Sequence, residues 1–353
     1  MRRVLLLVAA PVLALVATGP ALDRLARRLM QAPRRTPEEA GLGPALDRLG
    51  GEVVRLRSRD GVRLVGRWVP SDAQDDAPAG VDAHTDAPAI AHTDAPSDAA
   101  TPVDEWVPDP REAILLLHGY NGSIAPDLVE VGPFLRRTAS VLGLDFRGHG
   151  ASDDGPTTFG LLEVEDVAGG LAFLGERGVR RVALVGSSMG GITAIAAVAV
   201  LGDGRLASAD ADPAAPAGVV DAPRPRIVGI VADSVTPELA IVVGNRLGLP
   251  FGRRIAGRAF GRFDRLVGGD PRTTEPIAVI GLLEDMPLLL VHGEDDRTVP
   301  IQEGMRLAAA APPGVRHLVI PDADHGAGHR TDPVAYEAAA TGLLREAFLA
   351  ARS

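Results

Sequence analysis

The stretch from Val182 to Gly191 constrains the fold of this chain more than any other part of the sequence. It reads Val-Ala-Leu-Val-Gly-Ser-Ser-Met-Gly-Gly and runs into an Ala-, Ile- and Val-rich segment from Ile192 to Leu201. This order predicts a strand, a sharp turn at Ser188 and a buried helix. Such a turn holds its serine in a strained backbone conformation and leaves no space for a Cβ at the flanking glycines. The helix after the turn directs free amides toward the serine.

Composition excludes several classes of function. The hydrophobic fraction of 46% in 353 residues is enough for a large core, and all 36 basic residues are arginine. Ten of the 46 acidic residues lie between 71 and 110, so the rest of the chain is nearly neutral and we expect no nucleic-acid partner. Because cysteine is absent, disulfides, thiolate metal sites and a cysteine nucleophile are excluded. We expect neither a cofactor nor a metal.

Residues 1–50 have the pattern of a targeting segment followed by a tether. Arg2 and Arg3 precede an apolar run from Val4 to Gly19 that only Pro11 interrupts. This pattern predicts an uncleaved membrane anchor with the catalytic domain on the extracytoplasmic side. The alternatives are a signal peptide cleaved near Ala17, giving a secreted protein, and an amphipathic helix docked on a soluble domain.

Residues 51–353 read as one domain with two inserted loops. The tracts 71–110 and 207–225 are rich in Asp, Ala and Pro and have little to bury, so we expect both to be disordered. The first contains His84 and His92 in a near-repeat, for which a flexible polar loop is a better interpretation than a metal site.

The rest of this domain alternates between strand and helix patterns. A hairpin over 52–70 is followed by apolar runs at 113–117, 141–145, 180–186, 226–233, 286–293 and 315–321, with helical patterns at 126–137, 159–177, 192–201, 301–310 and 333–351. Such alternation predicts a mostly parallel, twisted sheet flanked by helices, with active groups at the carboxyl ends of the strands.

Four polar clusters follow predicted strands. They begin at His118, Gly186, Gly293 and Asp322. With these clusters in this order, and with an Asp-x-Arg-Gly-x-Gly-x-Ser segment at 145–152, the chain from about residue 52 onward resembles the α/β-hydrolase family. The resemblance is to its serine esterase, lipase and aminopeptidase-like branch, including members with an N-terminal membrane segment. It implies the α/β-hydrolase fold with a small helical cap, here at 235–283.

The resemblance also implies roles for particular residues. Ser188 matches the nucleophile, His325 the base that takes its proton, and Asp296 the acid that orients the imidazole. The backbone amides of Tyr120 and Met189 match the oxyanion hole.

Several neighbouring residues compete for these roles. Ser187 is adjacent to the nucleophile but puts the glycines at the wrong offsets, Asp295 and Glu294 compete with Asp296, and His329 competes with His325. His118 and His149 lie in glycine turns and are interpreted as structural, and His292 and His317 as packing or surface residues.

The combined hypothesis is a membrane-tethered serine hydrolase that cleaves a small-molecule acyl ester through an acyl-enzyme. A peptidase or acyl-thioesterase uses the same residues. A catalytically silent hydrolase-like binding or scaffold module is a further alternative. In the cap, apolar residues at 255, 259, 260 and 263 share one helical face among arginines, which fits either an acyl-chain site or a solvated helix packed on the body.

Overall fold

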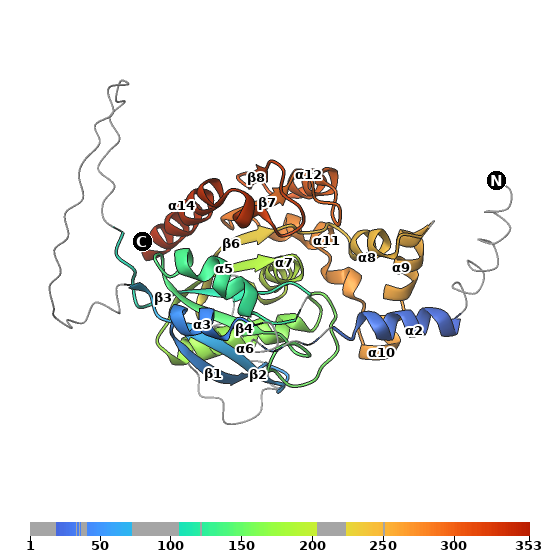
Figure 1. Cartoon of the computed structure of the whole chain (residues 1–353), viewed down its shortest axis with the longest axis horizontal. Helices are drawn as coiled ribbons and strands as arrows, with labels where there is room; N and C mark the ends of the chain where they lie inside the picture. Colours follow the sequence, from blue (N-terminus) through green and yellow to red (C-terminus); the bar gives the residue numbers. More distant parts are fainter. Residues whose placement is uncertain are drawn as a thin grey trace, which may run out of the picture.

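The computed structural model describes residues 19–32, 34, 36, 41–72, 106–120, 122–202, 224–249 and 251–353. In these ranges eight strands form a single sheet in the order β1-β2-β4-β3-β5-β6-β7-β8 (Figure 1). Strand β2 pairs antiparallel with β1 and with β4, and all other neighbours are parallel. The strands are β1 (Glu52–Arg57), β2 (Arg63–Val69), β3 (Glu112–Leu117), β4 (Ser140–Asp145), β5 (Arg181–Ser187), β6 (Arg226–Asp233), β7 (Leu288–Gly293) and β8 (Arg316–Ile320). The predicted fold class, a mostly parallel sheet of the α/β-hydrolase type, is confirmed.

Helices cover both faces of the sheet, which explains why its central strands are continuously apolar. In β3, Ala113, Leu115 and Leu117 belong to one buried cluster, and Ile114 and Leu116 belong to the other. The first cluster includes side chains of α6 (Glu163–Glu176), α7 (Met189–Leu201) and α12 (Ile301–Ala310). The second includes α3 (Gly43–Leu49), α5 (Ala125–Leu135) and α14 (Pro333–Arg352).

Helix α6 begins later than its apolar pattern predicts. The predicted helix starts at Phe159, but Phe159 and Gly160 have φ angles of 56° and 105°, which end any helix there. The buried carboxylate of Glu163 accepts hydrogen bonds from the backbone N–H groups of Thr158 and Gly160 and from the Thr158 hydroxyl. This carboxylate closes a turn in front of the first helical residue.

The segment between β6 and β7 carries the elements expected of a cap. These are α8 (Leu239–Leu247), α9 (Gly252–Phe260), α10 (Phe263–Val267), α11 (Pro276–Val279) and two short 3-10 turns, Pro271–Thr274 and Ile280–Leu282. Ala259, Phe260 and Phe263 are fully buried, whereas Ile255 is only half-buried. Helices α8 and α9 touch backbone to backbone, because a Cβ on Gly252 would lie 2.5 Å from the carbonyl oxygen of Gly244.

The membrane anchor is not supported by the described part of the chain. No helix there is long and apolar enough to cross a bilayer, so the expectation of a membrane-anchored, extracytoplasmic enzyme is wrong on this finding, and the secreted alternative gains no support. The apolar run that suggested an anchor lies almost wholly in residues 1–18, outside the described residues.

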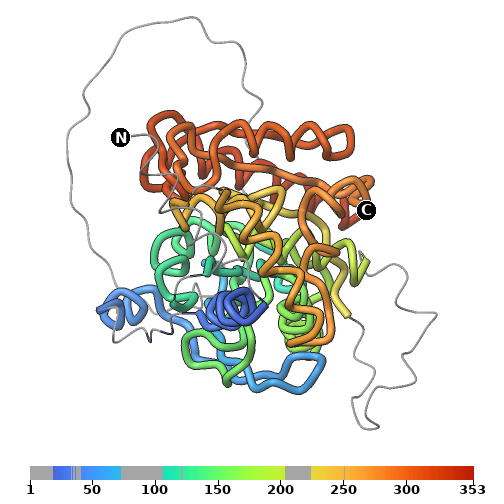
Figure 2. Tube along the Cα trace, turned by 90° about the vertical axis from the view of Figure 1, so that its right-hand side faces the viewer, coloured from blue at the N-terminus to red at the C-terminus, as the bar shows by residue number. Residues whose placement is uncertain are grey.

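The region expected to be a tether contains two helices that pack on the body. Helix α2 (Gly19–Leu29) buries Leu22 and Ala26, and Arg262 of the cap reaches Asp23 at 3.5 Å. Figures 1 and 2 both place this blue helix beside α9 and α10. Helix α3 buries Leu46 and Leu49 in the second core cluster. Both helices are amphipathic, and each packs its apolar residues against the body of the protein.

The two loops expected to be disordered fall largely on residues 73–105 and 203–223, outside the described residues. The first loop returns to the body earlier than its composition predicts. Trp106 donates a hydrogen bond to the Thr138 carbonyl (2.8 Å), and the guanidinium of Arg352 lies over its ring.

Candidate active site

The turn between β5 and α7 has the strained geometry that its sequence predicts. Ser188 has φ 51° and ψ −111°, a conformation that few side-chain-bearing residues adopt. A Cβ on Gly186 would lie 2.4 Å from the carbonyl carbon of Gly190, and one on Gly190 would lie 2.0 Å from the carbonyl oxygen of Leu117. Both positions therefore require glycine. The Ser188 N–H donates to the Asp233 carbonyl at the end of β6, which fixes the turn to the sheet.

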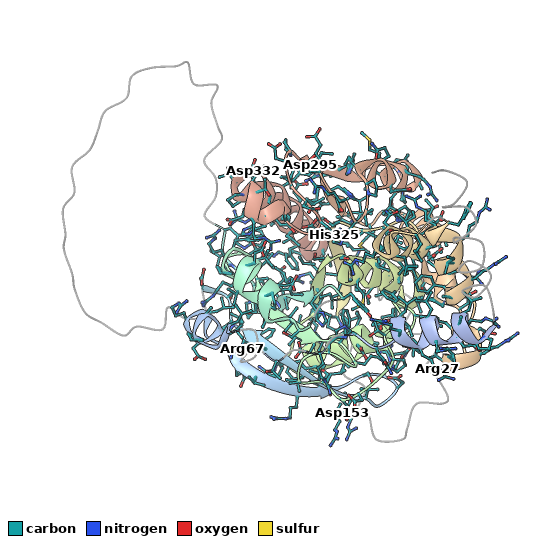
Figure 3. The ribbon with its side chains drawn as sticks, turned by 45° about the vertical axis from the view of Figure 1, so that its right-hand side comes forward. Arg27, Arg67, Asp153, Asp295, His325 and Asp332 are labelled. Atoms are coloured by element: carbon teal, nitrogen blue, oxygen red, sulfur yellow. The ribbon has the colours of Figure 1, made fainter. Side chains whose placement is uncertain are left out.

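Three side chains from distant parts of the sequence form a hydrogen-bonded chain at this turn. His325, in the loop after β8, has its Nε2 3.0 Å from Ser188 Oγ and its Nδ1 2.7 Å from Asp296 Oδ2. Figure 3 places His325 near the middle of the view, and the residue is half-buried. Because Nδ1 faces a carboxylate, it carries the ring proton, and Nε2 is left to accept the hydroxyl proton of Ser188.

The loop after β7 presents the Asp296 carboxylate as a hydrogen-bond acceptor. Asp296 is only 4% exposed, and its Oδ1 accepts hydrogen bonds from the backbone N–H groups of Thr298 (2.8 Å) and Val299 (2.7 Å). The second oxygen, Oδ2, is left for His325. His292 lies 3.6 Å from that oxygen but directs its Nε2 proton to the Val299 carbonyl. His292 therefore stabilises the backbone of this loop and leaves Asp296 Oδ2 to the imidazole of His325.

The competing acids and bases lie elsewhere. Asp295 and Glu294 are exposed, and Figure 3 places Asp295 at the edge of the molecule, away from His325. His329 is bound to Glu337 (3.1 Å) and faces Glu130 (3.8 Å), and these carboxylates raise its pKa.

Burial lowers the pKa of His118 to about 3. This neutral ring bridges backbone groups, because Nδ1 donates to the Gly119 carbonyl and Nε2 accepts from the Phe146 N–H.

The two residues predicted to supply oxyanion donors flank Ser188. The loop after β3 passes close to it, since a Cβ on Gly119 would lie 3.6 Å from Ser188 Cβ, and Tyr120 lines the same pocket as Ser188. Met189 is the first residue of α7, where a backbone N–H has no acceptor within the helix. The Tyr120 side chain points away and donates to the carbonyls of Leu29 (3.2 Å) or Gln31 (3.3 Å), next to α2.

A pocket of about 230 Å³ opens beside Ser188 and His325. Its wall includes residues that the sequence analysis did not select, namely Asp127, Glu130, Asp233, Arg246, Arg330 and Tyr336. Asp233 is the last residue of β6, and the rule that active groups follow parallel strands could have identified it. Asp127 lies inside a predicted helix, where no sequence signal distinguishes it.

Asp233 connects the pocket to the histidine loop. Its carboxylate accepts a hydrogen bond from the Ser234 hydroxyl (2.8 Å), which in turn accepts from the Gly326 N–H (2.9 Å). Burial raises the pKa of Asp233, although the hydroxyls of Ser234 and Tyr336 oppose this effect. These hydrogen bonds connect Asp233 through Ser234 to Gly326 and so fix the position of the residue that follows His325.

Fold and site together define the class of this protein. The chain belongs to the alpha/beta hydrolase family, whose sequence profile matches residues 114–339. It is 23% identical over 290 residues to the uncharacterized protein YfhR of Escherichia coli O157:H7, an alignment that covers 82% of this chain and 78% of that protein.

Solved structures share the fold at low sequence identity. The Pyrococcus furiosus esterase PF2001 superposes with a TM-score of 0.56 at 20% identity, covering 90% of this chain and 98% of that one. The esterase RhEst1 from Rhodococcus sp. ECU1013 gives a TM-score of 0.50 at 18% identity, covering 84% and 99%. These likenesses concern the fold, and family membership indicates a hydrolase.

Proposed function

We propose that this protein is a serine hydrolase that cleaves carboxylic esters, with Ser188 as nucleophile, His325 as general base and acid, and Asp296 as the orienting carboxylate. One observation supports this assignment above all others: the unbroken hydrogen-bonded chain from Ser188 Oγ through His325 to Asp296. A serine hydroxyl becomes nucleophilic when such a base accepts its proton. Two structurally similar proteins are described as esterases, which agrees with this choice of substrate class.

The proposed reaction has two stages. Ser188 Oγ attacks the ester carbonyl while its proton passes to His325 Nε2, and the backbone amides of Tyr120 and Met189 stabilise the oxyanion. Collapse of this intermediate expels the alcohol, which takes the proton from His325 and leaves an acyl-enzyme. Water then attacks the acyl-enzyme by the same proton transfers and releases the carboxylic acid.

A fluorophosphonate probe tests the nucleophile directly, because it reacts with activated serines. We expect the wild-type protein to be labelled at Ser188 and the Ser188→Ala variant to remain unlabelled. A panel of ester, thioester and peptide substrates, assayed with the same two proteins, separates esterase from thioesterase and peptidase activity. Labelling of both proteins, or of neither, contradicts the proposal, and the second outcome favours a catalytically silent module.

Replacement of Asp296 distinguishes the acid from its neighbour. In Asp296→Asn, the amide NH₂ faces His325 Nδ1 and donates to it, so the ring proton moves to Nε2 and the base is lost. We expect kcat to fall by ~10⁴-fold. The adjacent, exposed Asp295→Asn serves as the control and should stay within about twofold of wild type. Steady-state kinetics on one ester measures both, and equal losses in the two variants contradict the assignment.

A further inference from the structure

One carboxyl group in the wall of the pocket beside Ser188 has no hydrogen bond from another side chain. Glu130 is neutralised by its neighbours: burial opposes its ionisation, but hydrogen bonds from His329 and Arg330 outweigh this effect and lower its pKa. Asp233 accepts hydrogen bonds from hydroxyl groups, as described above. Asp127 has no such partner. Among the described residues no arginine or histidine nitrogen lies within 4 Å of its carboxylate, and no side chain donates to it. Its own backbone N–H donates to the carboxylate, and the charge of Arg330 acts on it from beyond that distance.

Asp127 is partly shielded from water in the same pocket. It is partly buried in the first turn of α5, and it lines the pocket together with Ser188 and His325. Burial, assisted by the negative charge of Glu130, raises its pKa to about 7. A carboxylate that is desolvated and faces another acid lowers the stability of the fold when it ionises.

A structural role does not account for this arrangement. An aspartate in the first turn of a helix interacts favourably with the helix dipole, but that interaction operates equally well at an exposed position. The guanidinium of Arg330, whose charge lowers the pKa of Asp127, is already bound to Glu130 and to the Gly326 carbonyl. A bound cation would supply the partner that Asp127 lacks.

Because Asp127 lines the pocket of the proposed active site, we expect the substrate to supply that cation. The pocket also holds the proposed nucleophile and base, so a group that fills it belongs to the molecule undergoing cleavage. We propose that Asp127 is a specificity-determining residue that selects esters carrying a cationic amine close to the scissile bond, an inference that rests on the ester hydrolysis proposed above. The carboxylate binds the ammonium group and thereby positions the ester carbonyl at Ser188.

Arg246 of the cap is a second guanidinium, besides Arg330, in the wall of this pocket. Its side chain is exposed on α8, whereas Asp127 lies in the less solvated part of the wall. Charge interactions weaken in contact with water and strengthen where water is excluded. Asp127 therefore dominates selectivity, and an anionic substrate would be disfavoured.

Isosteric ester pairs test the proposal. Methyl 6-aminohexanoate and methyl heptanoate differ by an ammonium group on the acyl side, and acetylcholine and 3,3-dimethylbutyl acetate differ by a cationic nitrogen on the alcohol side. We expect wild type to have a higher kcat/KM for the cationic member of at least one pair. In Asp127→Asn that preference, taken as the ratio of kcat/KM for the cationic ester to kcat/KM for its neutral isostere, should fall by ~10- to 100-fold.

Controls separate this site from general charge effects. Asp264→Asn removes an exposed carboxylate on α10 and should leave the preference intact. A wild-type enzyme that hydrolyses neutral esters in a Ser188-dependent manner, with no cationic preference in either pair, overturns the role of Asp127 but not the proposed function. An Asp127→Asn variant that keeps the preference for the cationic ester also overturns the proposed role of Asp127.

A binding measurement covers the case in which no ester is cleaved. Isothermal titration of the four esters into Ser188→Ala and into Ser188→Ala/Asp127→Asn reports the cation site without turnover. Binding of a cationic ester that Asp127→Asn weakens by tenfold or more supports the site even if ester hydrolysis fails. Equal affinity for cationic and neutral esters in Ser188→Ala overturns it.

Discussion

Ser188→Ala and His325→Ala are each expected to lower kcat/KM for an ester by ~10⁴- to 10⁶-fold, and the double variant to be no worse than either one. Ser188 Oγ and His325 Nε2 are 3.0 Å apart and act as one unit, so removal of either partner removes the activated nucleophile. Steady-state kinetics measures the losses. Circular dichroism and thermal unfolding should show a native fold in all three variants, because neither side chain belongs to a core cluster.

Ser187→Ala is the matched comparison for this prediction. Ser187 is the last residue of β5, and among the described residues the hydroxyl that His325 Nε2 binds is that of Ser188, so the Ser187 variant should retain most of the activity. Multiplicative losses in the Ser188/His325 double variant, or an inactive Ser187→Ala with an active Ser188→Ala, contradict the assignment of the nucleophile.

Gly190→Ala is expected to have the largest effect on stability. The new Cβ would lie 2.0 Å from the carbonyl oxygen of Leu117. That oxygen belongs to the backbone of a central strand and the Cβ is attached directly to the backbone of α7, so α7 and β3 must separate. We expect a loss of more than about 3 kcal/mol in the free energy of unfolding, or failure to fold. Urea unfolding followed by circular dichroism, together with soluble yield, measures the effect.

Gly342→Ala is the control for this substitution. Gly342 lies inside α14, and nothing outside its own turn approaches within 4 Å of a Cβ there. Replacement of a glycine in a helix by alanine gains up to about 1 kcal/mol. If Gly190→Ala unfolds at the same urea concentration as Gly342→Ala, the close approach of α7 to β3 is not present in solution.

The fold could be predicted from sequence because each of its elements has a local cause. Apolar runs of five to eight residues, such as 113–117, predict strands buried on both faces, and their alternation with helical patterns leads to a parallel sheet. The boundary of α6 could not be predicted, since it depends on the Glu163 carboxylate binding the turn at Thr158 and Gly160. The spacing of apolar residues gives no sign that the Glu163 side chain closes a turn and thereby sets the start of α6.

The N-terminal prediction was wrong for an instructive reason. A charged start followed by apolar residues is typical of an anchor, and it predicts that the residues up to about 50 form a tether. In the structure, Leu22, Ala26, Leu46 and Leu49 are buried against the cap and the second core cluster. Short amphipathic helices that pack on a protein share their composition with a membrane-proximal tether.

The sequence by itself determined the sheet, the elbow at Ser188 and the order of the polar clusters, because strand propensity, glycine sterics and chain order are local properties. Only the tertiary structure decided which acid faces the imidazole, since Asp295 and Asp296 differ by one position and are separated by burial. It also decided that Asp127, in the first turn of a helix that its sequence does not distinguish, lines the same pocket as the nucleophile with no hydrogen bond from another side chain. Both outcomes depend on how the strand ends converge in space, and spacing along the chain carries no information about that convergence.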